Sequence, residues 1–515
     1  MPKGLVSRGV LMNWGALAIS FLVGFLLFPF VVSRLGDTWY GVWTLVNAVV
    51  SYLGLLDFGL RGAVTRFVSR DHVLGDHGHS SDVVSTALWL RLWSASCCAV
   101  IGVALSMPVT RMLRIPVEMQ DAASLAIGIS VASFTVNLTC GVFGGVLAGK
   151  GRFDLLSAVA IGQSVVRALG VIWLLNSGYG IMALAWWDLT LAVLANGALA
   201  GLSFRVYPEL RITLRWPDAG IVRELWGYGV YAFLINTAVQ FVYYTDALVV
   251  SAFLSAATVT VYAIGGGLIE YLRQLVSALS VTFTPFASRL DAAGRQDEMR
   301  RLLIWGTRVV LFVALPVEIA LWCRGRTFIG LWMGQQYSAP AGQVLEILLL
   351  GQVFAIANLT SSGIAYGLGK HRPVAMWACV EALANLALSI LLVRPLGLAG
   401  VAWGTVVPSL AVQILFWPQY VCRLTGMPVR HYLWQAWIRP GLTVIPFGVV
   451  SYIVDRVWPP GGLPAFLLQV LVTLPLFPLS VAVCFWSEVR GPLARGVNGI
   501  SVYRVIVEHL RRSRA

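Results

Sequence analysis

Long apolar stretches separated by short polar segments recur along almost the whole chain. The first runs from Val10 to Val32 and the last from Ala465 to Trp486. An α-helix needs ~20 mostly apolar residues to cross a bilayer, and these stretches have that length. The pattern predicts about fourteen transmembrane helices, near residues 10–33, 39–60, 85–108, 122–147, 153–176, 180–203, 228–254, 258–284, 302–323, 343–368, 373–394, 398–422, 437–457 and 464–486.

The composition supports lipid as the main solvent of this chain. Hydrophobic residues make up 58% of the 515 residues and charged residues only 12%, whereas a soluble domain is roughly 25% charged. We therefore predict an all-α polytopic membrane protein. The first apolar run is too long for a signal-peptide core and no small-residue cleavage site follows it, so we interpret it as the first span.

The net charge of +14 is better explained by membrane orientation than by nucleic acid. When the N-terminus is placed in the cytoplasm, most Lys and Arg residues fall in cytoplasmic segments, as the positive-inside rule requires. The alternation predicts that both termini are cytoplasmic.

Metal or cofactor chemistry is not indicated. None of the seven cysteines has the spacing of metal ligands, and all lie in or beside apolar runs. The segment from Asp71 to Asp82 is rich in His and Asp, but we interpret it as a solvated loop. Asp57-Phe58-Gly59 spells the magnesium motif of kinases without the phosphate loop that accompanies it.

Two halves of the chain repeat short motifs at a near-constant offset. Gly-Lys-x-Arg occurs at 149–152 and again at 369–372, in the loops before the fifth and eleventh predicted helices. An even number of helices per copy gives two parallel six-helix lobes around a central cavity. The predicted domains are an N-terminal lobe (1–220), a C-terminal lobe (221–425), two extra helices (426–490) and a basic cytoplasmic tail (491–515).

The second predicted helix carries the most specific motif. Leu56-Asp57-Phe58-Gly59-Leu60, followed by Arg61 and Arg66, resembles a signature of polysaccharide transporters, the Wzx-type flippases of the MOP exporter superfamily. Arg34-Leu35-Gly36 and Tyr40-Gly41 are also similar to that family. The resemblance implies a fourteen-helix, two-lobed fold in the bacterial inner membrane. It also implies transport of undecaprenyl-pyrophosphate-linked sugars to the periplasmic face by alternating access.

Charged and amide residues inside the spans are the candidate substrate-binding residues. A charge at mid-bilayer costs ~2.5–3.5 kcal/mol, so it normally faces a cavity or a partner. Glu270 and Arg273 lie one helical turn apart. Either Arg273 binds the pyrophosphate, with Glu270 as its counter-ion or as a protonatable coupling group, or the two residues form a structural ion pair. The full set predicted to line the cavity is Arg273, Arg167, Glu270, Asp246, Asn236, Gln240, Tyr243, Gln163, Glu381 and Asn385.

Three further residues form a candidate gate. Asp57 and Arg61 lie at the inner end of the second predicted helix, where they either gate substrate entry or anchor the helix at the interface. Arg91 either joins this gate or extends to the membrane surface.

We predict a flippase for lipid-linked oligosaccharide that serves synthesis of surface polysaccharide such as O-antigen, capsule or exopolysaccharide. Its expected partners are membrane lipid, a polysaccharide polymerase and a chain-length regulator. A MATE-like drug/cation antiporter is disfavoured by the cationic residues Arg167 and Arg273. A membrane-embedded glycan polymerase or ligase should carry a large external loop, and the external linkers here are short.

Overall fold

The computed structural model describes residues 3–57, 59–213, 216, 218–280 and 283–485. Within them 89% of residues are helical and no strand is present, so the predicted all-α class is confirmed. Eleven segments are long and apolar enough to cross a membrane, and one of them, 372–425, has 54 residues. The chain is a multi-pass membrane protein; the number of fourteen helices stays a prediction.

The chain divides into two compact units by its internal contacts. Unit 1 contains residues 1–271 and 370–412, and unit 2 contains residues 272–369 and 413–515. Contacts group helices that pack together, whereas a repeat groups helices of common origin. The two six-helix repeats therefore stay a prediction, and the tail at 491–515 lies outside the described residues.

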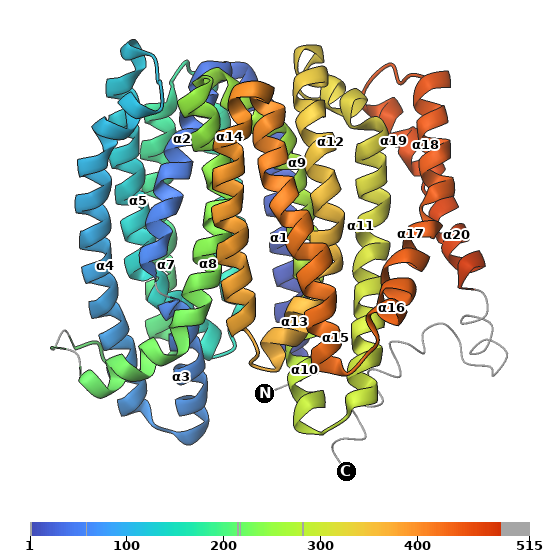
Figure 1. Ribbon diagram of the computed structural model, residues 1–515. Coiled ribbons are helices and arrows are strands. Elements are labelled where there is room, and N and C mark those ends of the chain that lie inside the picture. The colour runs from blue at the N-terminus through green and yellow to red at the C-terminus, as the bar shows by residue number, and fades with distance from the viewer. Residues whose placement is uncertain (1–2, 58, 214–215, 217, 281–282, 486–515) are drawn as a thin grey trace. The chain divides into compact units, whose positions relative to one another are not determined.

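Unit 1 is built from long helices that run side by side, with α2, α4, α5, α7 and α8 clearly visible in Figure 1. Its elements are α1 (Lys3–Leu35), α2 (Asp37–Leu53), the 3-10 helix η1 (Gly54–Asp57), α3 (Leu60–Leu74), α4 (His77–Met112), α5 (Val117–Gly149), α6 (Phe153–Asn176), α7 (Ile181–Val206), α8 (Ala219–Phe253), the first part of α9 (Ala256–Ser280) and α14 (Arg372–Ala411).

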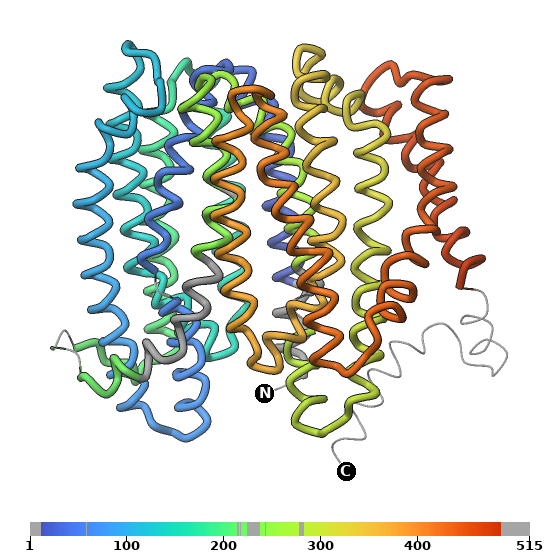
Figure 2. The backbone as a smooth tube through the Cα atoms, in the orientation of Figure 1, coloured from blue at the N-terminus to red at the C-terminus, as the bar shows by residue number. Residues whose placement is uncertain are grey.

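The element α14 is a hairpin of two helices, whose two arms are visible in the tube drawing (Figure 2). Gly397 has φ 60° and ψ −134°, a conformation that breaks the helix. Gly400 and Gly404 lie against Leu392 and Ser389 of the first arm, where an added Cβ would come within 2.0 Å and 2.3 Å of other atoms. Small residues four apart let two membrane helices approach closely, so this spacing holds the two arms together.

Unit 2 contains two long helices, α11 (Gln296–Trp332) and α12 (Gln335–Ala357), joined by a short turn. The remaining elements are α10 (Phe283–Ala292), α13 (Leu359–Gly367), the π-helix η2 (Val412–Phe416), which starts at the unit boundary, α15 (Trp417–Thr425), α16 (Val429–Tyr432), the π-helix η3 (Leu433–Ile438), α17 (Arg439–Thr443), α18 (Ile445–Val457), α19 (Leu463–Thr473) and α20 (Leu476–Cys484). One core cluster joins α11, α12, α18 and α20 through residues such as Leu315, Ala357 and Phe447.

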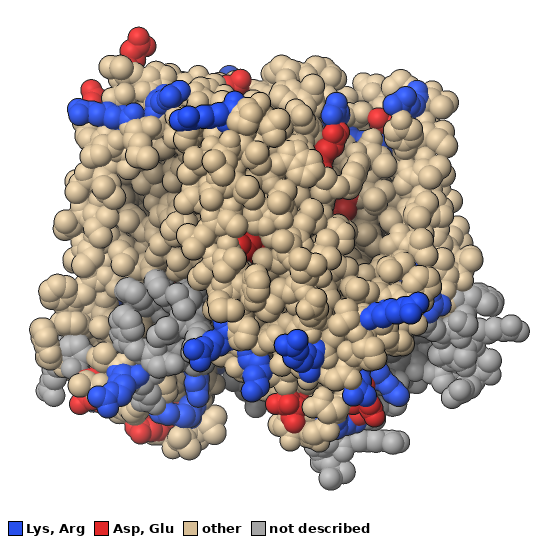
Figure 3. Space-filling model, viewed as in Figure 1, with Lys and Arg blue, Asp and Glu red and all other residues tan. Residues whose placement is uncertain are grey.

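Charge is distributed as the hydropathy pattern predicts. On the face drawn in Figure 3, Lys and Arg of both units gather toward the helix ends, and the surface between them is almost uncharged. Many large apolar side chains on the outer helices are exposed, for example Val100, Leu194 and Leu391. An apolar belt of this kind is what a bilayer covers.

Candidate functional site

An exposed ion pair within the predicted spans joins α6 to α7. Arg167 Nε donates to Asp188 Oδ1 at 2.7 Å and its Nη2 donates to Oδ2 at 2.9 Å. The Arg167 side chain is 46% exposed and that of Asp188 is 25% exposed. Asp188 was missed by the sequence reasoning, although it is the single acidic residue of its apolar run and that could have marked it.

Polar and aromatic groups of unit 1 surround this pair. Arg167 interacts electrostatically with Tyr40 of α2, which in turn interacts with Tyr271 of α9. One turn before Arg167, Ser164 of α6 shares a hydrogen bond of 2.9 Å with Ser20 of α1. The predicted residue Gln163 is partly buried on the same helix. A guanidinium group with hydroxyl groups near it is an arrangement that can receive an anionic, sugar-bearing molecule.

A second polar cluster in unit 1 centres on Asp246 of α8. The Tyr262 hydroxyl donates to Asp246 Oδ2 at 2.6 Å and the Thr405 hydroxyl donates to it at 2.7 Å. Asn385 Nδ2 donates to Thr405 Oγ1 at 2.8 Å. The structure therefore brings together the predicted residues Asp246 and Asn385, with α9 and α14 supplying hydroxyls. Asp246 Oδ1 and Asn385 Oδ1 are buried without a partner among the described residues.

The other predicted residues of unit 1 are less central to these contacts. Glu381 is partly buried on α14, one turn from Asn385, and interacts with Ser409 of the other arm. Gln240 is partly buried on α8 and its Nε2 lies close to Gly54. The side chains of Asn236 and Tyr243 lie outside the described residues.

Glu270 and Arg273 are both partly buried on α9, one turn apart as the sequence predicted. The division between the units falls between them, at residues 271 and 272. Arg167 thus belongs to unit 1 and Arg273 to unit 2, and a chamber that both line stays a prediction.

The candidate gate is a cluster around η1, α4 and α5. Gly59 has φ 68°, which ends the predicted second helix and starts α3 in a new direction. The Arg91 guanidinium bonds the carboxylate of Asp57 and the carbonyl oxygen of Leu138. The Arg91 side chain is only 2% exposed, so the alternative in which it extends to the surface is wrong.

Glycines of α5 make room for the two arginines of this gate. A Cβ on Gly141 would lie 2.6 Å from Arg91 Nη1, and one on Gly144 would lie 3.2 Å from Arg61 Nη2. Arg61 is exposed and its positive charge acts on Arg91. Two guanidinium groups beside the single carboxylate of Asp57 leave an excess positive charge, which suits an anionic ligand.

Unit 2 holds a buried polar network that sequence reasoning missed. Arg324 of α11 pairs with Asp455 Oδ1 of α18 at 3.0 Å and with the side chain of Gln469 of α19. Thr327 donates to Asp455 Oδ2 at 2.9 Å, and the Arg324 guanidinium lies over the Phe466 ring. No local signal in the sequence marks this network, because Arg324 finds its partners on helices that are distant in sequence.

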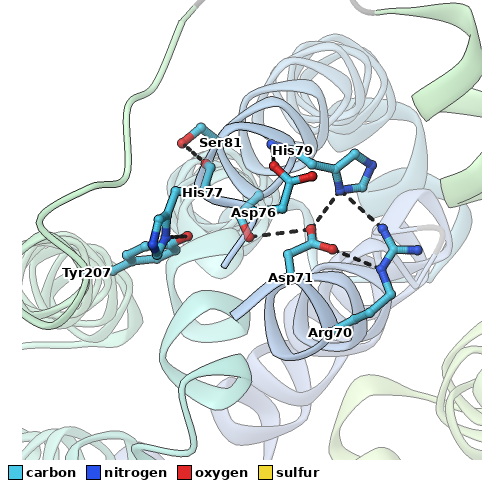
Figure 4. Close-up of polar contacts among 8 residues, drawn as sticks. Arg70, Asp71, Asp76, His77, His79, Ser81 and Tyr207 are labelled. Atoms are coloured by element: carbon cyan, nitrogen blue, oxygen red, sulfur yellow. Dashed lines mark hydrogen bonds and ion pairs between the residues drawn. The ribbon is translucent and has the colours of Figure 1, made fainter. Parts of the chain in front are cut away.

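The segment from Asp71 to Asp82 is mostly helical, not a solvated loop. Helix α3 extends to Leu74 and α4 starts at His77, so Gly75 and Asp76 alone connect them. Asp71 is buried and accepts hydrogen bonds from Arg70, His79 and Ser80 (Figure 4). Among the described residues no group of His, Cys, Asp and Glu side chains could hold a metal ion.

Beside the connection between α3 and α4, Tyr207 links His77 to the Gly-Lys-x-Arg loop. The Tyr207 hydroxyl bonds His77 Nδ1 at 2.9 Å (Figure 4), and Lys150 lies over the Tyr207 ring and 3.0 Å from His72 Nδ1. Burial, together with the charges of Lys150 and His77, lowers the pKa of His72. Burial also lowers the pKa of Lys150. The repeated Gly-Lys-x-Arg motif thus has a structural role in its first copy, where Lys150 contacts Tyr207 and His72.

The chain matches a known protein family. The model of the family described as "Polysaccharide biosynthesis protein" matches residues 31–341. A protein of Shigella flexneri named "Putative O-antigen transporter" is 24% identical over 421 residues, which cover 78% of this chain and 94% of the relative.

Two solved transporter structures share the fold. A MATE family multidrug transporter of the MOP superfamily, in an inward-facing conformation, matches with a TM-score of 0.67 at 16% identity. The match covers 81% of this chain and 94% of the transporter chain. The lipid II flippase MurJ matches with a TM-score of 0.67 at 13% identity, and the match covers 93% of this chain and 99% of the MurJ chain.

Proposed function

We propose that this chain, which belongs to the polysaccharide biosynthesis protein family, transports undecaprenyl-pyrophosphate-linked oligosaccharide across the bacterial inner membrane. The Shigella relative is named for O-antigen transport, which is one fate of such a substrate. The chain is a multi-pass membrane protein with a transporter fold. The direction is from the cytoplasmic to the periplasmic face, with both termini in the cytoplasm.

The Arg167–Asp188 pair is the observation that carries the proposal. It lies within the predicted spans of α6 and α7, yet nearly half of the Arg167 side chain is exposed. A charge exposed to hydrocarbon is costly, so such a residue faces a water-filled space. Guanidinium binds phosphate oxygens bidentately. We infer that a diphosphate competes with Asp188 for Arg167 and there recovers part of its lost hydration.

The remaining predicted residues take roles in the same cycle. Arg273, one turn from Glu270 on α9, is a second cationic residue for binding the diphosphate. Arg61, supported by Arg91 and Asp57, receives the diphosphate at the cytoplasmic entrance. Alternating access exposes these sites in turn.

Energy for transport comes from an ion gradient in this proposal. Asp246 is the principal coupling group of unit 1, because one of its buried carboxylate oxygens has no partner among the described residues. Glu381, partly buried and one turn from Asn385, is the second candidate. Partners of the transporter are membrane lipid and, downstream, a polymerase and a chain-length regulator.

The antiporter alternative shares the fold but not the charge. A MATE structure matches as well as MurJ does, so the fold alone does not choose between a drug and a lipid-linked sugar. A site for organic cations requires an excess of carboxylate, and at the candidate gate two arginines face one aspartate. The anionic substrate is therefore favoured.

The test is an Arg167→Ala variant in cells that lack the native gene. We expect surface glycan to be lost and lipid-linked oligosaccharide to accumulate on the cytoplasmic leaflet, while the protein still inserts. Arg326→Ala is the matched control, because Arg326 forms a similarly exposed bidentate pair with Glu346 in unit 2. Normal glycan export by a stably inserted Arg167→Ala protein would contradict the proposed site.

A further inference from the structure

A buried carboxyl group in unit 2 is not used by the function proposed above. Glu318 lies in the middle of α11 and is 3% exposed. Neither of its carboxylate oxygens has a hydrogen-bond partner among the described residues. Two other acidic side chains of this unit, Glu346 and Asp455, are each paired with an arginine.

The antiparallel register of α11 and α12 shows what lies at the level of Glu318. Ala314 packs in one core cluster with Ile356, and nearer the connecting turn Gly325 lies against Leu345. Glu318 lies one helical turn after Ala314, and Gln352 lies one turn before Ile356. In this antiparallel register Gln352 is therefore at the level of Glu318. Gln352 is itself buried, and its Nε2 has no partner in the described part of the chain.

Among the described residues, no charged side chain pairs with the Glu318 carboxyl group. The charged residues on elements packed against α11 are Glu270 and Arg273 of α9, Arg289 and Asp291 of α10, Glu346 of α12, Arg423 of α15, Arg439 of α17, and Asp455 and Arg456 of α18. None of these described groups forms a hydrogen bond with the Glu318 carboxylate. An ionised carboxylate without a partner in such a place costs several kcal/mol, so the group is neutral in this conformation.

Helix α11 can bend at this position. Pro316 precedes Glu318 by two residues and has no N–H, so the carbonyl of Phe312 lacks its helical donor from position 316. Prolines within membrane helices are common bending points. A bend here changes the surroundings of Glu318 more than those of residues at the helix ends.

We propose that Glu318 is a proton-binding site that couples a proton gradient to the conformation of unit 2. The conformation described here is the proton-loaded one. In the other conformation the carboxyl group reaches water, its O–H bond breaks, and the proton passes to water to leave the carboxylate. Protonation therefore stabilises the closed surroundings of Glu318. The use of this proton for transport rests on the proposed function, whereas its binding does not.

Proton binding is tested on the full-length protein with dicyclohexylcarbodiimide, an apolar reagent that modifies protonated carboxyl groups in apolar surroundings. We expect an adduct at Glu318, located by mass spectrometry of peptides, whose yield falls about tenfold per pH unit above the midpoint. Glu318→Gln should remove this adduct, and Glu346→Gln should keep it. A yield at Glu318 that does not change with pH, or that sodium ions suppress at constant pH, would overturn the proposal.

Coupling is tested in vesicles with an imposed pH gradient. Transport of lipid-linked oligosaccharide by the unmodified protein should respond to the gradient. Glu318→Gln, which resembles the protonated carboxyl group, should lose the response while the protein keeps its melting temperature. An unchanged response in Glu318→Gln would disprove coupling at this residue without affecting the flippase assignment. Labelling of Glu318 in a protein that moves no lipid-linked sugar would instead contradict the proposed function alone.

Discussion

Two arginine–aspartate pairs of this protein have similar chemistry and opposite surroundings. In unit 1, Arg167 and Asp188 keep 46% and 25% of their side-chain surfaces exposed. In unit 2, Arg324 is fully buried and Asp455 keeps 18%, with Gln469, Thr327 and Phe466 completing the contacts. The first pair can exchange its partner for a ligand, and the second pair cannot without disrupting three helices.

An intramembrane charge is therefore not by itself evidence of a transport site. An ion pair whose arginine is fully buried fixes the position of helices, here α18 and α19 against α11. An exposed pair in the same kind of span leaves its charges accessible. The two pairs should therefore respond differently to mutation, and the following predictions are ordered by the expected loss of folded protein.

The largest loss is expected for Arg324→Leu. Removing one partner of a buried pair leaves an uncompensated charge on Asp455, which costs ~3–5 kcal/mol. We expect little folded protein in detergent, measured by melting temperature and size-exclusion chromatography. The double variant Arg324→Leu with Asp455→Leu should recover much of the loss, since it removes both charges. A double variant no better than the single one would contradict this account.

An intermediate loss is expected for Arg91→Leu. The charge-assisted hydrogen bonds to Asp57 and the Leu138 carbonyl would be lost, at ~1.5–3 kcal/mol. Asp57 keeps 40% of its surface exposed, so its carboxylate can be rehydrated, unlike that of Asp455. The melting temperature should fall between those of Arg324→Leu and the unmodified protein. A fall as large as that of Arg324→Leu would show that exposure of the remaining partner does not matter.

A small loss of stability with a large loss of transport is expected for Arg167→Ala. Exposed ion pairs contribute about 0–1 kcal/mol, so the melting temperature should change little. Asp188→Asn frees the guanidinium of Arg167 and should tighten binding of a diphosphate while slowing its release. The readouts are melting temperature and export of lipid-linked oligosaccharide in the same preparations. Equal destabilisation by Arg167→Ala and Arg324→Leu would remove the distinction between the pairs.

The smallest effect concerns His72, outside the membrane spans. Its pKa is lowered in the folded protein, so the unfolded chain binds more protons as pH falls below about 6.5. Stability from this group is present above the unfolded pKa and decreases as pH falls through the folded pKa. His72→Gln should flatten the dependence of melting temperature on pH in this acidic range by a small amount. A steeper dependence in the variant would contradict the assigned direction.

Local patterns were sufficient to predict the class of fold. Apolar runs identified the helical membrane protein, and Asp57, Gly59 and Arg61 carried the family resemblance that the comparisons confirmed. These properties depend on the length of each run and on the composition of short segments. Each can be read from neighbouring residues, because an isolated helix already satisfies its own backbone in lipid.

Partners of the polar side chains were decided by the tertiary structure alone. Arg167 finds Asp188 on the next helix, Asp246 finds Thr405 across a large separation in sequence, and Arg324 finds Asp455 on α18. Glu318 finds none among the described residues. Whether such a group is paired, exposed or enclosed depends on which helices pack beside it. The spacing of residues within one helix does not show which side chains of other helices lie beside it. The positions of the charged residues could therefore be predicted from the sequence, whereas their partners and exposure depend on how the helices pack.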